Sequence, residues 1–453
     1  MVKVVSLSQE IKLSTTNNAR SVALKTLIRV FENNSYSNIS LNNSLKNSDL
    51  SIADQNLATK IVYGTIQYKI YLEYQLKDLI KVKIKESYLK PLLLMSVYQI
   101  VFLDKVPNRA VLDEANKLAK QFGKKRSSGF RLVNGILRSF IRRGKILPNS
   151  NDLIEYLSVK ESFPIWLVKY LIDQFGQEKT ENILASFNKN AKNSVRISSL
   201  IDKQEVLDKL KKESFKPKLS SLTSQVAILD HGGIAETDLF EDGKITIQDE
   251  AASLVVDSFK FSKTDQVLDA CSAPGGKTIQ IAEKIPEGQV TALDIHKNKL
   301  NLVVKNAQRM HVADRVKTTA VDARKSDEYF SGQEFDKILV DAPCSGLGLM
   351  RRKPEIRYTK SKKDLVNLQK IQLSILDHVS QLLKKNGELV YSTCTISIEE
   401  DENVVQKFLE AHPNFELQPF NLEKVDSKTG TLKIMPDEYD SDGFFIAKFK
   451  LRG

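Results

Sequence analysis

The sequence has 453 residues, of which 41% are hydrophobic and 27% charged, and its formal net charge is +12 at pH 7. This composition is that of ordinary globular domains, and the length is enough for two or three of them. Three cysteines in so long a chain exclude a disulfide framework and favour a reducing compartment. The amino-terminal residues lack the apolar core of a signal peptide, and no run approaches the roughly 18 apolar residues that cross a bilayer. We therefore expect a cytoplasmic protein with no membrane partner.

The positive charge is concentrated near the amino terminus. Residues 16–145 contain 23 Lys and Arg against 9 Asp and Glu, a net charge of +14. A basic first domain followed by a nearly neutral remainder suggests a polyanionic partner that is held by the first domain. A solvated lysine-rich surface would produce the same charge, and charge alone does not separate the two interpretations.

The first third of the chain has helical periodicity. Apolar residues recur at three-to-four spacing over residues 19–32, 51–66, 88–103, 109–123 and 128–143. This pattern predicts an all-helical bundle. The Asn- and Ser-rich text at 33–48 predicts a loop, and "GKILPNSND" at 144–152 predicts a linker.

The remaining chain changes from helical to mixed patterns. Residues 164–187 are expected to be helical, and residues 193–238 to form a small α/β unit. From about residue 244, β-like runs alternate with helical segments, which predicts a parallel sheet with crossover helices. The runs are 265–270, 289–295, 316–323, 336–342, 387–393 and 444–451.

Four of the predicted strands end in an aspartate, namely Asp269, Asp294, Asp322 and Asp341. Ligands of open α/β sheets bind beyond the carboxyl ends of the strands, so these side chains should gather around one crevice. An aspartate after a strand often serves only as a helix N-cap. Four of them in register favour a binding pocket.

The stretch "DACSAPGGKT" at 269–278 follows the first of these strands with a glycine-containing loop and a helix start. It is not a phosphate-binding P-loop, because that motif needs glycine where Cys271 stands, and no G-x-G-x-x-G is present. Asp294 suits the hydroxyls of a ribose, and Asp322 could accept a hydrogen bond from an adenine amino group. These features predict an adenosine-bearing cofactor without phosphate recognition, and S-adenosylmethionine fits that description.

Cys344 and Cys394 also follow predicted strands. A lone cysteine at such a place is more often a small buried hydrophobe, but two beside a cofactor pocket favour a nucleophile. A thiolate that adds to carbon 6 of a pyrimidine makes carbon 5 able to attack a methyl donor, with Asp341 as a candidate for proton exchange with the base. The acidic residues 399–402 would oppose ionisation of Cys394 if they were close, and Lys277 is one possible compensating charge.

Metal binding by these thiols is disfavoured. The cysteines are 73 and 50 residues apart, whereas zinc sites show close pairs such as C-x₂₋₄-C. We therefore expect no metal.

Three motifs together resemble those of the RNA cytosine-5 methyltransferases: "DACSAPGGKT", "DAPCSGLG…RRKPEIRY" and "STCT…EEDENVV". The text "VPNRAVLDEANKLAK" followed by "GFRLVNGILR" is similar to the helical domain of the antitermination factor NusB. The whole layout resembles the bacterial members that act on small-subunit rRNA. The resemblance implies a NusB-like RNA-binding helical domain over 16–145, linker helices and a small α/β subdomain over 146–238, and a Rossmann-like S-adenosylmethionine-dependent methyltransferase domain over 239–453.

The resemblance also implies residue roles. Cys394 would be the nucleophile, and Cys344 would assist release of the methylated product. Asp294, Asp322 and Asp341 would complete a cofactor site whose loop is formed by Cys271, Ser272, Ala273, Pro274, Gly275, Gly276 and Lys277. RNA contacts are expected at Gln248, Asp249, Arg351 and Arg352. The implied substrate is one cytosine of 16S rRNA, free or in an early assembly particle, and the implied state is a monomer.

Three alternatives stay open. In a DNA cytosine-5 methyltransferase Cys344 would be the nucleophile, assisted by Glu402 of "ENV", but the helical periodicity of 402–411 argues against a glutamate at a strand end. The RNA could instead be a tRNA or 23S rRNA. The chain could also be a non-catalytic RNA-binding assembly factor, although its intact aspartates and cysteines argue against a decayed site.

Overall fold

A computed structural model of the chain describes residues 18–33, 37–124 and 128–452. Contacts between residues divide it into two compact units, Met1–Ser162 and Phe163–Gly453. No helix within the described residues is long and apolar enough to cross a membrane.

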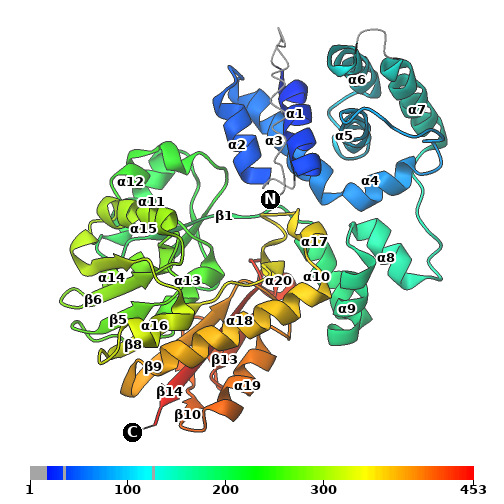
Figure 1. The fold of residues 1–453 in the computed structure, drawn as a ribbon. Coiled ribbons are helices and arrows are strands. Elements are labelled where there is room, and N and C mark those ends of the chain that lie inside the picture. The colour runs from blue at the N-terminus through cyan, green and yellow to red at the C-terminus, as the bar shows by residue number, and fades with distance from the viewer. Residues whose placement is uncertain (1–17, 34–36, 125–127, 453) are drawn as a thin grey trace, which may run out of the picture. The chain divides into compact units, whose positions relative to one another are not determined.

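The first unit is helical (Figure 1, blue to cyan). Helix α5 is its centre, because every residue from Leu89 to Gln99 except Lys90 is buried, which is the mark of a helix packed on all sides. The predicted helical bundle is confirmed. Its helices are α1 (Ala19–Asn33), α2 (Ser37–Lys46), α3 (Ile52–Gln67), α4 (Lys69–Leu76), α5 (Leu89–Phe102), α6 (Asn108–Phe122), α7 (Gly129–Arg143) and α8 (Leu153–Glu161).

Helix α2 corrects the prediction of a loop over 33–48. Asn and Ser are poor helix formers in isolation, so composition pointed to a loop. In the fold, however, α2 packs against α1 and buries Leu41. The Ser44 hydroxyl donates to the Ser40 carbonyl at 2.8 Å and accepts from the Thr26 hydroxyl of α1 at 3.1 Å. Tertiary packing thus overrides local preference.

The segment 144–152 forms neither helix nor strand, but it is held in place. The buried amide of Gln75 in α4 donates to the Ile146 carbonyl at 2.8 Å and accepts from the Ile146 N–H at 3.0 Å. Asp152 then caps α8 by accepting from the Glu155 N–H at 3.0 Å. The segment is therefore part of the first unit.

The second unit begins with two helices and a small antiparallel sheet, α9 (Ile165–Phe175), α10 (Gln177–Phe187) and strands in the order β2-β3-β1-β4. This arrangement confirms the predicted helices at 164–187 and the small α/β unit. The strands and helices of that unit are β1 (Asn193–Ile197), α11 (Lys203–Lys212), β2 (Lys218–Leu219), β3 (Val226–Leu229), η1 (Ile234–Glu236), α12 (Asp238–Glu241) and β4 (Ile245–Ile247).

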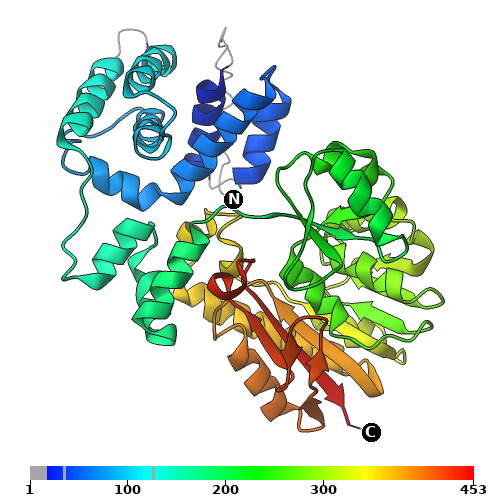
Figure 2. The ribbon, with the colours of Figure 1, turned by 180° about the vertical axis from the view of Figure 1, so that it is seen from behind.

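A large mixed sheet follows, in the order β10-β14-β9-β8-β5-β6-β7, with β13 paired to β14 (Figures 1 and 2). Strands β5 to β9 are parallel, and β14 runs antiparallel to β9. The strands are β5 (Gln266–Asp269), β6 (Gln289–Leu293), β7 (Val316–Thr319), β8 (Phe335–Asp341), β9 (Leu383–Thr393), β10 (Phe415–Leu417), β13 (Thr431–Ile434) and β14 (Phe444–Leu451), with β11 (Phe420–Asn421) and β12 (Asp426–Ser427) as a separate pair.

Helices cover both faces of the large sheet. They and the short 3₁₀ turns are α13 (Glu250–Asp257), α14 (Gly276–Lys284), α15 (Lys297–Arg309), η2 (Ala313–Arg315), η3 (Ala323–Lys325), α16 (Ser326–Tyr329), η4 (Leu347–Leu349), α17 (Ile356–Thr359), α18 (Lys362–Ser380), α19 (Glu402–Ala411) and α20 (Pro436–Tyr439).

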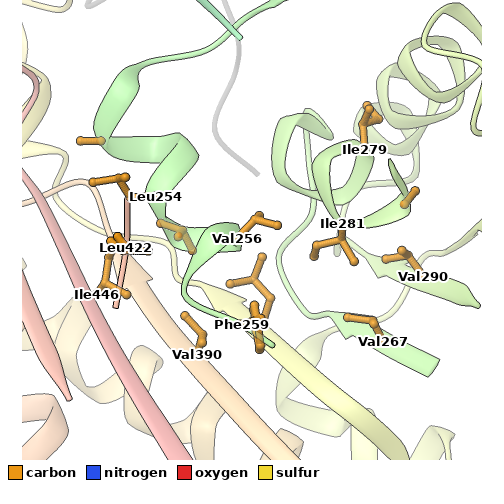
Figure 3. Packing of buried hydrophobic residues seen from close by; sticks show 14 of the residues in the cluster. Leu254, Val256, Phe259, Val267, Ile279, Ile281, Val290, Val390, Leu422 and Ile446 are labelled. Carbon is orange, nitrogen blue, oxygen red and sulfur yellow. The ribbon is translucent and has the colours of Figure 1, made fainter. Parts of the chain in front are cut away.

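The core alternates with the two-residue period of the strands. Val267 of β5 and Val390 of β9 pack in a cluster with α13 and α14, whereas the next residue of β5, Leu268, and the preceding one of β9, Leu389, pack with α18 and α19. Figure 3 shows the first of these clusters. Strands that are buried on both faces confirm the Rossmann-like parallel sheet expected from the sequence.

A buried ion pair joins the small sheet to the large domain. Arg196 Nη1 of β1 lies 2.6 Å from Glu283 Oε2 of α14, and both side chains are at most 2% exposed. Arg196 Nε also donates to Gln248 Oε1 at 2.8 Å. If one member of such a pair is removed, the other is left as an uncompensated buried charge.

We therefore expect Glu283→Gln to lower the free energy of unfolding by about 3–5 kcal/mol, measured by urea denaturation. The matched control is Glu205→Gln. It breaks the 3.0 Å pair with Lys244, in which the glutamate side chain is 61% exposed, and its effect on stability should be far smaller, because water screens exposed ion pairs. Equal losses in the two variants would contradict a special role for the buried pair.

Candidate active site

The order of the large sheet reverses between β5 and β8, and open α/β sheets bind ligands at such a point. Asp269 and Asp341 are the last residues of these two strands, and Asp294 directly follows β6. Asp322 lies three residues beyond β7, which ends at Thr319, so it is not at a strand end as predicted. It caps the η3 turn instead.

The loop 271–277 is fixed to the neighbouring strand. The N–H and hydroxyl of Ser272 both donate to the Leu293 carbonyl at the end of β6, each at 2.8 Å. Gly275 has φ +109°, and a Cβ there would lie 3.1 Å from Val303 Cα of α15. Glycine at 275 thus lets the chain turn into α14 while it passes close to α15.

Asp269 is almost completely buried at the base of this loop. Its Oδ2 accepts from the Thr278 hydroxyl at 2.6 Å, whereas Oδ1 has no hydrogen-bond partner in the described part of the chain. Burial raises the pKa of Asp269 to about 7, against the opposing effect of the Thr278 hydrogen bond. Oδ1 of this buried carboxyl group can therefore accept a further hydrogen bond.

Cys271 lies among the predicted aspartates. Burial raises the pKa of its thiol well above the ordinary value, and the nearby charges of all four predicted aspartates raise it further. All four carboxyl groups are therefore close enough to Cys271 for their charges to act on its thiol. A thiol whose ionisation is so strongly disfavoured is a poor nucleophile. Cys271 therefore suits a role in lining the cofactor site.

Asp341 is held in a single orientation by two partners. Lys277 Nζ lies 2.8 Å from its Oδ2, and the Ser392 hydroxyl of β9 donates to Oδ1 at 2.8 Å. The Lys277 ammonium also lies 5.0 Å from the centre of the Phe444 ring. Lys277, which was considered as a compensating charge for Cys394, thus forms its ion pair with Asp341.

Asp294 and Asp322 already accept hydrogen bonds from other groups of the protein. Asp294 Oδ1 accepts from the His296 N–H at 2.7 Å. Both oxygens of Asp322 accept from the guanidinium of Arg324, with the shortest contact at 2.6 Å, and this hydrogen bonding lowers the pKa of Asp322. Contact of Asp322 with an adenine would have to compete with Arg324.

Cys344 and Cys394 come together although 50 residues separate them. Their sulfur atoms are 3.2 Å apart, and both residues are only partly buried. The hydrogen bond with Cys394, together with burial, raises the pKa of the Cys344 thiol well above the ordinary value.

Backbone hydrogen bonds connect the two segments that carry the cysteines. The Gly348 N–H donates to the Cys394 carbonyl at 3.0 Å, and the Gly443 N–H donates to the Gly348 carbonyl at 2.9 Å. A Cβ at Gly348 would lie 2.0 Å from the Gly443 oxygen, so only glycine fits there.

Every residue of the acidic run 399–402 has a partner within the protein, and Glu400 and Asp401 are fully buried. Glu399 accepts from the Tyr170 hydroxyl, Asp401 accepts from the Thr393 hydroxyl at 2.6 Å, and Glu402 pairs with Lys433. Glu402 is the first residue of helix α19, which confirms its expected place on a helix. Sequence reasoning missed Glu400, whose side chain is fully buried between the two cysteine loops. The only signal was the hydroxyl residue that directly follows each cysteine, Ser345 after Cys344 and Thr395 after Cys394.

The predicted RNA contacts have partners within the protein. The Arg351 side chain is 1% exposed and bonds the carbonyls of Ser186 and Pro436, so phosphate contact finds no support there. Arg352 pairs with Asp249, itself a predicted RNA contact, at 2.8 Å and with Asp442 at 2.5 Å.

Gln248 is likewise engaged within the protein. Besides accepting from Arg196, its amide donates to Gln280 Oε1 at 3.0 Å, and its side chain lies beside Gly276 of the loop. These inward contacts give Gln248 a structural role beside the loop 271–277.

The raised pKa of Asp269 predicts a pH effect on stability. The folded state holds a proton that the unfolded chain releases between about pH 4 and pH 7, so this carboxyl group lowers stability as pH rises through that window. Asp269→Asn should remove this effect. The unfolding free energy of the variant relative to the wild type should therefore increase across the window, by at most roughly 4 kcal/mol. Urea denaturation at a series of pH values measures the difference, and a constant difference would contradict the prediction.

Known proteins match the chain over its length. Family models match residues 17–142 (NusB family), 163–234 (ferredoxin-like domain of RsmF/B-like methyltransferases) and 258–450 (16S rRNA methyltransferase RsmB/F). No group of His, Cys, Asp or Glu suited to a metal ion occurs among the residues described.

Two curated relatives cover nearly the whole chain. The probable ribosomal RNA small subunit methyltransferase B of Bacillus subtilis (strain 168) is 40% identical, over 96% of this chain and 99% of its own. The probable ribosomal RNA small subunit methyltransferase B of Synechocystis sp. is 31% identical, over 95% of this chain and 99% of its own. The crystal structure of PH0851 shares the fold with a TM-score of 0.82, at 24% identity over 96% of this chain and 99% of its own. The chain therefore belongs to the RsmB/F family of rRNA methyltransferases and is an S-adenosylmethionine-dependent RNA methyltransferase.

Proposed function

We propose that this protein transfers a methyl group from S-adenosylmethionine to carbon 5 of one cytosine of 16S rRNA, through a covalent bond between Cys394 and carbon 6. The observation that carries the proposal is the 3.2 Å separation of the Cys344 and Cys394 sulfurs, which follow the neighbouring strands β8 and β9 near the point where the strand order reverses. The names of the relatives, which are small-subunit rRNA methyltransferases B, support the choice of RNA.

Two adjacent thiols suit the chemistry of a pyrimidine. Carbon 5 of cytosine is a poor nucleophile until a thiolate adds to carbon 6, which makes carbon 5 enamine-like. We assign that addition to Cys394, which follows β9 directly. Asp341 is held by Lys277 and Ser392 and would contact the polar edge of the base.

The crevice residues fit the cofactor. The buried, unpaired Oδ1 of Asp269 and the close backbone at Gly275 suit a polar ligand that lies against the loop, and the half-buried Asp294 suits ribose hydroxyls. When bound, S-adenosylmethionine supplies an electrophilic methyl group. Asp269, Asp294 and the loop 271–277 would hold it at this edge of the sheet.

Product release needs two events at the base. The proton on carbon 5 must be removed, and the bond between Cys394 and carbon 6 must break so that Cys394 leaves as a thiolate. We assign assistance of this step to Cys344. As a thiol, Cys344 can donate a hydrogen bond to the Cys394 sulfur, 3.2 Å away, and so stabilise the departing thiolate.

The RNA must present its cytosine outside a base stack, because ring chemistry cannot occur within one. The excess positive charge of residues 16–145 suits contacts to flanking phosphates. Exposed arginines at 131, 138 and 142 on helix α7 are candidates for such contacts.

Separate substitution of the cysteines tests the chemistry. Cys394→Ala should abolish transfer of labelled methyl groups to 16S rRNA, because no adduct can form. Cys344→Ala should instead accumulate a covalent protein–RNA complex that resists denaturing electrophoresis. The opposite pattern, with Cys344→Ala unable to form an adduct, would favour the DNA-type scheme. Bisulfite sequencing of the rRNA identifies the cytosine.

A triple Arg→Gln variant at 131, 138 and 142 tests the electrostatic contribution of the first unit. Its affinity for 16S rRNA fragments should fall. The slope of log affinity against log salt should become shallower by about 0.7–0.9 for each phosphate contact that is lost. Replacing the three lysines in the last turn of α11 by glutamine makes the same change in charge and serves as the control. Equal effects of the two variants would contradict an RNA-binding role specific to α7.

A further inference from the structure

Glu400 stands between the two cysteine loops. It lies in the turn between β9 and α19, and its side chain is completely buried. No part of the proposed reaction uses it. A buried carboxylate is costly unless its oxygens are satisfied, so its surroundings indicate what it holds in place.

Two of its hydrogen bonds come from the residue after Cys344. The Ser345 N–H donates to Glu400 Oε1 at 2.7 Å, and the Ser345 hydroxyl donates to Oε2 at 2.5 Å. The Gln372 amide of α18 donates to Glu400 Oε1 at 3.2 Å and also to the Pro343 carbonyl at 3.0 Å. The loop that carries Cys344 is thus fixed on both sides of the cysteine.

The loop that carries Cys394 is bound to the same carboxylate. The Ser397 hydroxyl donates to Glu400 Oε2 at 2.7 Å. The Thr395 and Ser345 hydroxyl oxygens are 2.9 Å apart. Because the Ser345 proton is directed to Glu400, Thr395 must be the donor in that contact. The residues that follow the two cysteines are therefore linked through one buried group.

The charge of Glu400 is met only by neutral donors within the described residues. Lys433 pairs with the neighbours, Asp401 and Glu402. All four contacts to Glu400 come from N–H or O–H donors, so a carboxylate, which only accepts, matches them better than an amide or a carboxylic acid.

We propose that Glu400 is a positioning residue for methyl transfer, whose buried carboxylate locks the loops of Cys344 and Cys394 so that both sulfurs meet at one point of the crevice. The assignment to methyl transfer rests on the proposed function. Its negative charge has a second effect. Together with the hydrogen bond to Cys394 and burial, it raises the pKa of the Cys344 thiol, which keeps Cys344 protonated while Cys394 attacks.

The test compares Glu400→Gln with the matched control Glu402→Gln, which neutralises the exposed partner of Lys433 two residues away. Glutamine at 400 retains the shape but offers one acceptor oxygen to four donors. The turnover number should fall roughly tenfold or more, because misplaced reacting groups slow a reaction strongly. The KM for S-adenosylmethionine should stay within about twofold, since Glu400 holds the cysteine loops and not the cofactor loop.

A second readout does not depend on catalysis. Dilute hydrogen peroxide oxidises two adjacent thiols to a disulfide and is itself reduced to water. Peptide mapping should show the Cys344–Cys394 disulfide forming more slowly in Glu400→Gln than in the wild type or Glu402→Gln. In the Cys394→Ser background, the pH midpoint for alkylation of Cys344 by iodoacetamide should move lower with Glu400→Gln, because a negative charge is removed. A neutral residue that only filled the space between the loops would not produce that shift.

Turnover, disulfide rate and alkylation midpoint that all match the wild type would overturn the proposal. If Glu400→Gln does not fold, Ser345→Ala and Ser397→Ala each remove one donor and no charge. A lower turnover number at an unchanged melting temperature would support the proposal, and wild-type turnover in both would overturn it. If Cys394→Ala still methylates RNA, the proposed function fails, whereas the disulfide and alkylation measurements still decide the role of Glu400.

Discussion

The site depends on one constraint, the parallel pairing of β8 with β9. In that register Asp341 lies opposite Ser392, so the chain leaves both strands at the same edge of the sheet. Cys344 comes three residues after Asp341, and Cys394 two residues after Ser392. Segments 50 residues apart therefore deliver two thiols to within 3.2 Å of each other, beside the point where the strand order reverses.

The surroundings of this pair show how the fold keeps such an arrangement in place. Asp269, Glu400 and Asp401 are carboxyl groups with almost no exposed surface, and each is costly to bury. Their partners are hydroxyl, amide and ammonium groups from helices, strands and the two cysteine loops. A domain optimised for stability alone would replace such groups with apolar ones, so their concentration at one edge of the sheet is typical of a functional site.

Composition and position in a motif could not reveal the elements and contacts that depend on packing. Helix α2 forms in Asn- and Ser-rich text because Leu41 and the serine hydroxyls find partners on α1. Arg351 and Arg352 follow a cysteine motif like surface residues, yet they bond to segments more than 80 residues away in the sequence. Charge and local pattern cannot reveal a partner so distant in the chain. Whether a charged residue is buried in an ion pair depends on such a partner.

The sequence by itself determined the fold class, the helical first domain and the ends of the strands that finish at or just before Asp269, Asp294 and Asp341. Hydrophobic periodicity predicts which residues face a core. Aspartates and cysteines that follow strands predict where a ligand binds, because ligands of open α/β sheets bind beyond the carboxyl ends of the strands. Only the tertiary structure decided that the two sulfurs are in contact, that Lys277 forms an ion pair with Asp341, and that Glu400 accepts hydrogen bonds from both cysteine loops. The reason is physical, since these contacts depend on strand register and loop path, which no local stretch of sequence encodes.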